Sequence, residues 1–258
     1  MPTKQNQWTG KLGFILSLAG AAVGLGNIWR FPCSVAEGGA MFILFYALSM
    51  FLLVLPIMFF EIKMGQIMRK NPIDSFKMVC AKYKINRLFV LNSYLGLFIV
   101  FCTLSFYTVV SGWVIYYLID AIVSPPVSDF ADARRQWMGL LQSPANMIKL
   151  NIIFLAANAI VLIRGVQRGL EFLNRIMMPG LFLILIFMLI FASFSEEMHV
   201  MRATHILTHL SMEQFNTTVF LQALGQALFT LAVGACAILT YGAYLPKKED
   251  KILLSANA

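Results

Sequence analysis

The sequence predicts an all-α integral membrane protein with six transmembrane helices, of which the first and the sixth are discontinuous. The first reason is composition: 59% of the residues are hydrophobic, only 12% are charged, and there are 22 Phe and 15 Met. An ordinary soluble domain is far less apolar. The second reason is a series of six apolar segments, most of them near the length of roughly 20 residues that a membrane helix needs. The third is that two of these segments carry glycines and polar residues where a plain membrane helix would carry neither.

The six segments follow one another along the chain. They cover about residues 12–32, 41–60, 88–119, 147–163, 176–194 and 219–245. The third is long enough to tilt strongly or to project beyond the bilayer. Two connections, at about 124–146 and 195–217, are long enough to carry helices of their own on the outer face. We therefore expect residues 1–251 to form one transmembrane domain and residues 252–258 to be the start of a truncated seventh helix.

The distribution of charge predicts the orientation. Of the 20 Lys and Arg residues, 15 fall at the N-terminus, at 61–87, at 164–175 and after 246. Cytoplasmic loops carry such an excess. We therefore expect a multi-pass protein of the cell inner (plasma) membrane with both termini in the cytoplasm. Topology and attraction to the anionic head groups of the lipid bilayer account for the net charge of +8, so no nucleic-acid partner is expected.

Several chemistries are not indicated by the sequence. The four cysteines lie far apart, without the spacing of a disulfide framework or a metal site. An enzyme would need a cluster of carboxylates or histidines, or a nucleophile with its base, whereas Glu61 is a lone acid that we interpret as structural. The irregular spacing of His199, His205 and His209 favours a solvated surface over a metal site. We expect no enzyme and no cofactor.

The stretch 20–32, Gly-Ala-Ala-Val-Gly-Leu-Gly-Asn-Ile-Trp-Arg-Phe-Pro, is unusual for a membrane span. Glycine adopts backbone conformations that strain other residues, so Gly24 and Gly26 before Asn27 predict an unwound helix. Unwinding frees carbonyls and amides that need partners in hydrocarbon, and a cation and an anionic group would satisfy them. The alternative is a Gly-x-x-x-Gly packing pair of Gly20 and Gly24, but Gly26 and Asn27 favour the site.

The segment 225–235, Gly-Gln-Ala-Leu-Phe-Thr-Leu-Ala-Val-Gly-Ala, repeats this feature in the sixth span. Small residues permit close backbone approach, and polar residues at mid-membrane depth must find partners. Two interrupted helices among six predict a binding site between them near the midplane of the membrane.

These stretches closely resemble the neurotransmitter:sodium symporter family, which includes bacterial leucine transporters. The resemblance at the start of the chain rests on Trp8, on Lys11-Leu12-Gly13, on 20–32 and on Glu37-Gly38-Gly39-Ala40. The segment from Gly225-Gln226 to Thr240-Tyr241-Gly242-Ala243-Tyr244 resembles the sixth helix of the family. The resemblance implies the first repeat of a leucine-transporter-like inverted-repeat fold, and a sodium-coupled amino acid symporter that works by alternating access.

The resemblance also implies two sodium sites. One would use the Ala22 carbonyl, the side-chain oxygens of Asn27 and Thr230, and the substrate carboxylate. The other would use the carbonyls of Gly20 and Val23. Sodium is a hard cation that prefers oxygen ligands, and no other metal is expected.

The implied substrate site has two parts. The amides around Leu25 and Gly26 would receive the carboxylate, and Tyr107 would hydrogen-bond it. The full set implied for the substrate is Ala22, Gly24, Leu25, Gly26, Thr103, Tyr107, Phe229, Thr230, Ala232 and Ala235. Because better-known members often carry serine and phenylalanine at the positions of Ala232 and Ala235, we expect a larger pocket and a bulky apolar or aromatic amino acid.

Two gates complete the implied site. Arg30 and Gln226 match the outer gate, and Trp8, Tyr244 and Lys4 match the inner gate. The alternative for Arg30 alone is an interfacial anchor that reaches to the head groups.

The sequence leaves three classes of function open. Family members have a second, inverted repeat, which this chain lacks, so we expect a truncated chain. It is a sodium-coupled symporter by ancestry; alternatively, it is a non-transporting fragment or a half-subunit that needs a second polypeptide. The third class is a channel or membrane enzyme.

Overall fold

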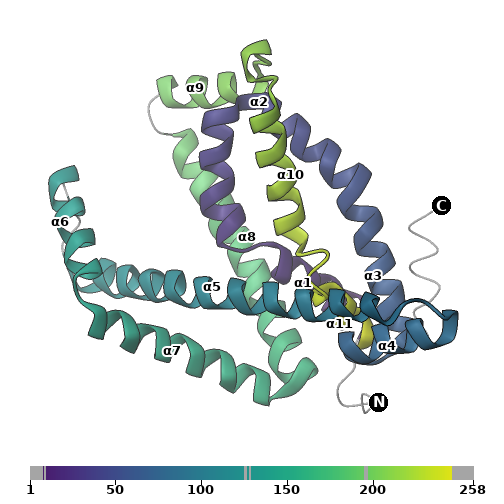
Figure 1. Cartoon of the computed structure of the whole chain (residues 1–258). Helices are drawn as coiled ribbons and strands as arrows, with labels where there is room; N and C mark the ends of the chain where they lie inside the picture. The colour runs from purple at the N-terminus through teal and green to yellow at the C-terminus, as the bar shows by residue number, and fades with distance from the viewer. Residues whose placement is uncertain (1–7, 9, 125–126, 128, 195–196, 246–258) are drawn as a thin grey trace.

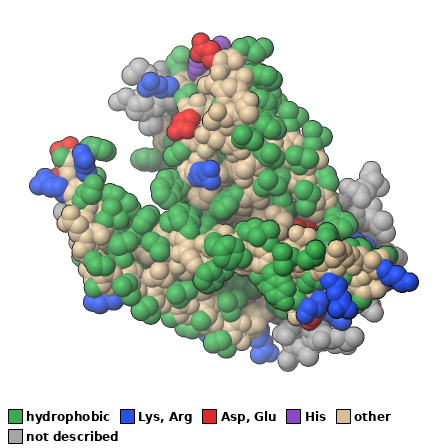
Figure 2. Space-filling view, in the orientation of Figure 1, with side chains coloured by type: hydrophobic (Ala, Val, Ile, Leu, Met, Phe, Trp, Pro, Cys, Tyr) green, Lys and Arg blue, Asp and Glu red, His purple; other side chains and the backbone are tan. Residues whose placement is uncertain are grey.

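The computed structural model describes residues 8, 10–124, 127, 129–194 and 197–245, and its regular elements there are all helices. The prediction of an all-α protein is therefore confirmed. Among the described residues, four helical stretches are long and apolar enough to cross a membrane: Gly26–Met68, Arg87–Val123, Pro144–Ile163 and Arg168–Ser193. The space-filling view shows hydrophobic side chains over much of the visible face (Figure 2). The chain is a multi-pass membrane protein.

The helical chain of residues 11–68 is interrupted after Ala22 and bends again at Gly39. Helix α1 (Lys11–Ala22) ends before the short π-helix η2 (Gly26–Arg30), which continues into α2 (Phe31–Ser49). Inside α2, Gly39 has φ 57° and ψ −153°, a conformation that only glycine adopts without strain. The ribbon rises to the α2 label and then descends through η3 (Met50–Val54) and α3 (Leu55–Met68) (Figure 1). Gly39 thus divides the apolar stretches predicted at 12–32 and 41–60.

A short helix and a long one follow. Asn71 caps α4 (Pro72–Tyr83), because its side chain accepts a hydrogen bond from the Asp74 amide at 2.8 Å and Pro72 suits the first helical position. The 3-10 turn η4 (Arg87–Val90) leads into α5 (Leu91–Val123). Helix α5 runs beside α7 (Pro144–Ile163) (Figure 1).

Helix α6 (Phe130–Leu141) lies in the first connection that was expected to carry a helix. It is attached to the end of α5. The Trp137 ring packs edge-on against Trp113, with ring centroids 4.9 Å apart. The Gln136 side-chain amide donates a hydrogen bond to Asp120 at 2.5 Å.

The rest of the chain returns to the first helices. The π-helix η5 (Val166–Glu171) and α8 (Phe172–Ser193) pack against α1, where a Cβ atom at Gly13 would collide with Glu171 and one at Gly20 with Asn174. Next come α9 (Glu197–Thr208), η6 (Met212–Gln214), α10 (Thr217–Leu231) and α11 (Ala237–Ala243). Because Gly24 faces Tyr107 of α5 rather than Asn174 of α8, Gly20 and Gly24 do not form one packing pair.

Two clusters of buried residues hold the first and last helices together. One joins the N-terminal segment, α3 and α11, and consists of Trp8, Met58, Ile62, Ile238 and Leu245. The other joins α2 and α10, and consists of Val35, Phe42, Val219 and Ala223. The first cluster also contacts Phe14 and Leu18 of α1. The segments before the first interruption and after the last one therefore pack in one cluster, and α2 and α10 pack in the other.

Helices α3 and α11 approach so closely at Gly65 that adding one methyl group there should destabilise the protein. A Cβ atom at Gly65 would collide with the Leu239 carbonyl, which is backbone and cannot move aside. We expect Gly65→Ala to destabilise the protein by about 1–3 kcal/mol, as overpacking does, and to lower the melting temperature of the detergent-solubilised protein. Gly139→Ala is the matched control, because nothing lies within 4 Å of a Cβ atom there. Equal melting temperatures for the two variants would contradict the prediction.

Candidate functional site

The break after α1 leaves backbone groups without helical partners. Val23 is extended, with φ −90° and ψ 95°, and helical hydrogen bonding resumes where the Asn27 amide donates to the Gly24 carbonyl at 3.0 Å. The last carbonyls of a helix and the first amides of the next have no intrahelical partner. Carbonyls of α1 and amides leading into η2 therefore meet at one place, and both are partly buried.

A second break separates α10 from α11. Ala232, Gly234 and Cys236 all have positive φ, of 49°, 81° and 61°. The left-handed conformation costs roughly 1–2 kcal/mol at a residue with a side chain, so the surrounding structure must stabilise Ala232 and Cys236. Part of that stabilisation comes from Glu61 of α3, whose carboxylate accepts a hydrogen bond from the Gly234 amide at 2.6 Å.

Asn27 connects the two breaks. Its side-chain oxygen accepts hydrogen bonds from the Thr230 hydroxyl at 3.0 Å and from the Gln226 amide at 3.2 Å. Its side-chain nitrogen donates to the Ala22 carbonyl at 2.7 Å. Three of the residues predicted for one sodium site, Ala22, Asn27 and Thr230, are thus brought together.

Gln226 and Thr230 are the buried side of this network. Their exposed fractions are 1% and 8%. Gln226 also donates to the Gly26 carbonyl at 3.1 Å, which ties η2 directly to α10. In this dry surrounding each polar atom needs a partner, and the neutral oxygens gathered here suit a hard cation.

An aromatic wall lies beside the network. The rings of Tyr107 and Phe229 stack with centroids 6.1 Å apart. The Tyr107 hydroxyl would lie 3.4 Å from a Cβ atom at Gly24, and Phe229 only 2.6 Å from one at Gly26. Any larger residue at Gly26 would therefore displace the wall from the backbone of the break.

The remaining predicted substrate and sodium residues lie in different settings. Ala232 and Ala235 are half-buried within the second break. The Thr103 hydroxyl donates to the Ile99 carbonyl of its own helix at 2.8 Å. Gly20 packs against Asn174, while Val23 donates back to Ala19.

The predicted gating residues separate into two groups. At the outer gate, Gln226 is buried in the network, whereas Arg30 is exposed at the end of η2. Trp8 belongs to the other end of the site: its indole donates to the Tyr241 carbonyl at 3.1 Å, and its amide donates to the Tyr244 carbonyl at 3.3 Å. Lys4 lies outside the described residues.

Sequence reasoning missed the part that Glu61 takes in the site. A structural role was predicted for this acid, and its hydrogen bond to the Gly234 amide is a structural one, but its place at the second break was not predicted. An acid inside an apolar span is costly and is by default a sign of function, and that signal was available. Nothing in the sequence indicated its partner, the Gly234 amide, which lies 173 residues further along the chain.

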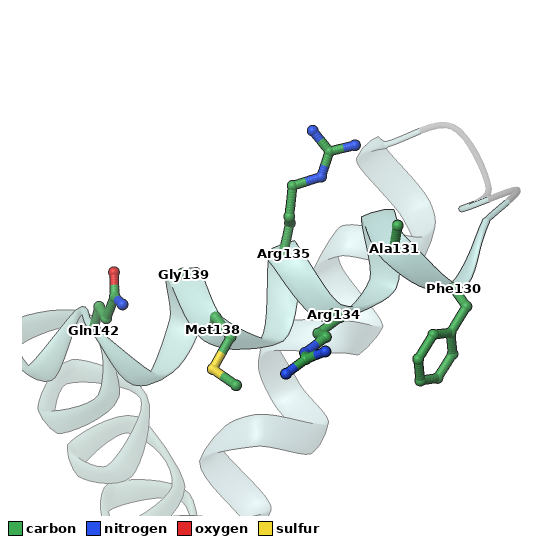
Figure 3. A pocket seen from close by; sticks show the side chains of 7 residues that line it. All are labelled: Phe130, Ala131, Arg134, Arg135, Met138, Gly139 and Gln142. Carbon is green, nitrogen blue, oxygen red and sulfur yellow. The ribbon is translucent and has the colours of Figure 1, made fainter.

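A shallow depression elsewhere does not belong to this site. It is formed by residues of α6 and by Gln142 directly after it, and includes Phe130, Arg134 and Met138 (Figure 3). Helix α6 lies at the opposite end of α5 from α11 (Figure 1), so the depression is remote from both breaks.

The Glu61 contact predicts a graded effect of substitution. Glu61→Ala removes the hydrogen bond to the amide of Gly234, which is an exposed residue of the chain, so we expect the loss of one ordinary hydrogen bond, about 0.5–1.5 kcal/mol. Glu61→Gln keeps an acceptor oxygen and should restore part of the loss. We expect the order wild type, Gln variant, Ala variant in melting temperature, with faster amide exchange at 232–236 in the Ala variant. Glu37→Ala, at an exposed acid of α2, is the control, and a loss as large as that of Glu61→Ala would contradict the assignment.

Comparison with known proteins identifies relatives along the whole chain. The model of the sodium:neurotransmitter symporter family matches residues 5–139. The uncharacterized sodium-dependent transporter YhdH of Bacillus subtilis is 33% identical over 250 residues, which are 96% of this chain and 54% of that protein. An uncharacterized sodium-dependent transporter of Haemophilus influenzae is 31% identical over 261 residues, which are 96% of this chain and 56% of that protein.

A solved structure agrees in fold. The crystal structure of MhsT in complex with L-phenylalanine superposes with a TM-score of 0.82 at 31% identity, and the match covers 97% of this chain and 56% of that one. The chain spans about half the length of the curated relatives it matches. The family consists of transporters, not enzymes. Because the family model matches residues 5–139, more than half of the chain, the chain belongs to the sodium:neurotransmitter symporter family.

Proposed function

We propose that this chain builds the substrate and sodium site of a sodium-coupled amino acid symporter, which works by alternating access around a site near the membrane midplane. One observation carries the proposal: the Asn27 side chain joins the Ala22 carbonyl to the Thr230 hydroxyl across the two breaks. A site located between two broken helices can change its access when one helix rocks against the other.

The sodium ions are cargo in this proposal. Ala22, Asn27 and Thr230 offer three neutral oxygens to one ion, and the substrate carboxylate supplies a negative oxygen. The carbonyls of Gly20 and Val23 serve a second ion, because they lie at the open end of α1. Without the carboxylate the first ion lacks a charged ligand, so sodium and substrate bind together.

The substrate is held at both ends. Its carboxylate binds the amides near Leu25 and Gly26, where a helix N-terminus attracts negative charge, and it accepts a hydrogen bond from the Tyr107 hydroxyl. Its side chain occupies the space bounded by Thr103, Phe229, Ala232 and Ala235. Two alanines and an aromatic wall favour a bulky apolar or aromatic amino acid. The structural relative MhsT has been solved with L-phenylalanine, which supports this class.

We propose that residues 1–251 form one domain with six membrane spans. The protein lies in the cell inner (plasma) membrane, with both termini in the cytoplasm. The first span joins α1 to η2 and the start of α2, and the sixth joins α10 to α11. Arg30 and Gln226 close the outer side. Trp8, Tyr244 and Lys4 close the inner side, supported by the hydrogen bonds of Trp8 to Tyr241 and Tyr244.

The alternative is a non-transporting fragment, or a half-subunit that needs a second polypeptide to transport. The chain spans about half the length of the curated relatives it matches. Binding and transport separate the alternatives from the main proposal: substrate binding by the chain without transport into liposomes would favour the fragment or the half-subunit.

The main test measures binding of L-phenylalanine, L-leucine and glycine to the purified chain in nanodiscs, in Na⁺ and in K⁺. We expect binding only in Na⁺, with phenylalanine and leucine above glycine. Binding that is equal in K⁺, or no binding by folded protein, would overturn the sodium-coupled site. A preference for glycine would overturn the substrate class alone.

Substitution at Asn27 tests the sodium ligands. Asn27→Ala removes the oxygen shared by Thr230 and Gln226, and contacts to a charged group contribute about 1.5–3 kcal/mol, so we expect sodium affinity to fall by about tenfold or more. Thr204→Ala is the control, because that hydroxyl bonds only within α9. The measurement is the sodium dependence of phenylalanine binding, and unchanged dependence in Asn27→Ala would contradict the assignment.

Substitution at Ala235 tests the pocket. Ala235→Phe fills the space assigned to a bulky side chain, so phenylalanine binding should weaken by about tenfold or more, since overpacking costs about 1–3 kcal/mol. Glycine needs none of that space and should bind no worse. Competition binding with both amino acids measures the difference. An equal loss for both would show that the variant damages the fold rather than the pocket.

A further inference from the structure

Two histidines form an exposed pair at the end of α9. The His205 and His209 rings are stacked, with centroids 4.8 Å apart and planes inclined by 19°. The helical hydrogen bond from the His209 amide to the His205 carbonyl, at 2.9 Å, holds the two residues one turn apart. Both side chains are exposed. The structure thus places together two residues whose spacing to His199 suggested only a solvated surface.

The orientation of α9 is fixed by its other side. Ile206, between the two histidines in sequence, packs against the buried cluster of Val35, Phe42, Val219 and Ala223. Residues four apart share a helix face, whereas the next residue points about a quarter turn away. The packed face therefore holds α9 while the histidine pair stays beside it, open to solvent.

Two imidazoles one helical turn apart are a metal-binding arrangement. The rings are stacked in this structure, and because both side chains are exposed they are free to turn so that one nitrogen of each faces the same ion. Neutral imidazole suits zinc, copper and nickel, and the affinity order of divalent ions places copper highest. Helix α9 ends at Thr208, so the pair lies at the helix C-terminus, where the unpaired carbonyls favour a cation. Met201, exposed one turn before His205 on the same row, is a soft neighbour that adds no charge. Arg202 is the nearest cation on the helix.

We propose that His205 and His209 bind one divalent transition-metal ion per chain, Cu²⁺ more tightly than Zn²⁺, with water in the remaining positions. In Figure 1 α9 lies near the α2 label, at the far end of α10 from α11, so this site is separate from the sodium and substrate site. The bound ion bridges one helical turn and extends the ordered end of α9 through His209.

The test titrates the purified full chain, carrying no polyhistidine tag, with CuCl₂ and with ZnCl₂ in detergent micelles. Exposed Cys33 and Cys102 are first alkylated, so that thiols neither bind nor reduce the metal. Calorimetry should give one Cu²⁺ per chain and weaker Zn²⁺, and the electron paramagnetic resonance spectrum should show two nitrogen ligands. His205→Ala or His209→Ala should weaken Cu²⁺ binding about tenfold or more, because the second ligand of a chelate acts at high effective concentration.

Two controls separate a chelate from scattered histidines. His199→Ala removes a histidine six positions from His205 and should leave Cu²⁺ binding unchanged. His209→Ala/Leu210→His keeps the number of histidines but changes the spacing from four to five, and should bind as weakly as His209→Ala. All of these positions except His199 are shown to be exposed, and an unchanged melting temperature without metal verifies folding in each variant.

Several results would overturn the proposal. They are wild-type Cu²⁺ affinity in either single alanine variant, full affinity in the variant with altered spacing, or one ion per two chains. Slower amide exchange at 205–210 when Cu²⁺ is present would support it independently of the calorimetry, and unchanged exchange there would contradict it.

Discussion

Every part of the proposed site depends on how the chain satisfies the backbone groups that two helix breaks expose. In a membrane an unpaired amide or carbonyl costs several kcal/mol, so a break persists only where side chains supply partners. Asn27 does this for the first break through Ala22, and Glu61 for the second through Gly234. Gln226 and Thr230 then join Asn27 to α10, so the two breaks form one polar region inside an apolar protein.

The same network explains why the site suits ions. Oxygens held together by hydrogen bonds within a low-dielectric surrounding interact strongly with a charge, and these oxygens are supplied by the end of α1, by η2 and by α10. The buried cluster of Val35, Phe42, Val219 and Ala223 packs α2, which continues directly from η2, against α10. Packing thus determines the spacing of the ligands, and hydrogen bonding determines their direction.

The local sequence made the helix ends predictable, but it did not predict contacts between residues far apart along the chain. Glycines at 24 and 26 beside Asn27, and the small residues at 232–235, predicted where helices would end, because conformational freedom is a property of the residues themselves. The contact of Asn27 with Thr230 joins residues 203 apart, and only the family resemblance placed them together. The anchoring role of Glu61 and the packing of Gly13 against Glu171 follow from how α3 and η5 lie, which periodicity does not reveal. The stacking of His205 on His209 was missed because the spacing was judged over three histidines rather than over the pair.

The central claim is that Asn27 and Thr230 act together on one sodium ion. A double-mutant cycle of Asn27→Ala and Thr230→Ala, read as the sodium dependence of phenylalanine binding to the chain in nanodiscs, tests it most directly. Side chains that share a ligand show coupling energies of about 0.5–3 kcal/mol. We predict a coupling within that range, with the double variant losing less sodium affinity than the sum of the single losses. Additive losses would show that the two side chains act on sodium independently and would contradict the account.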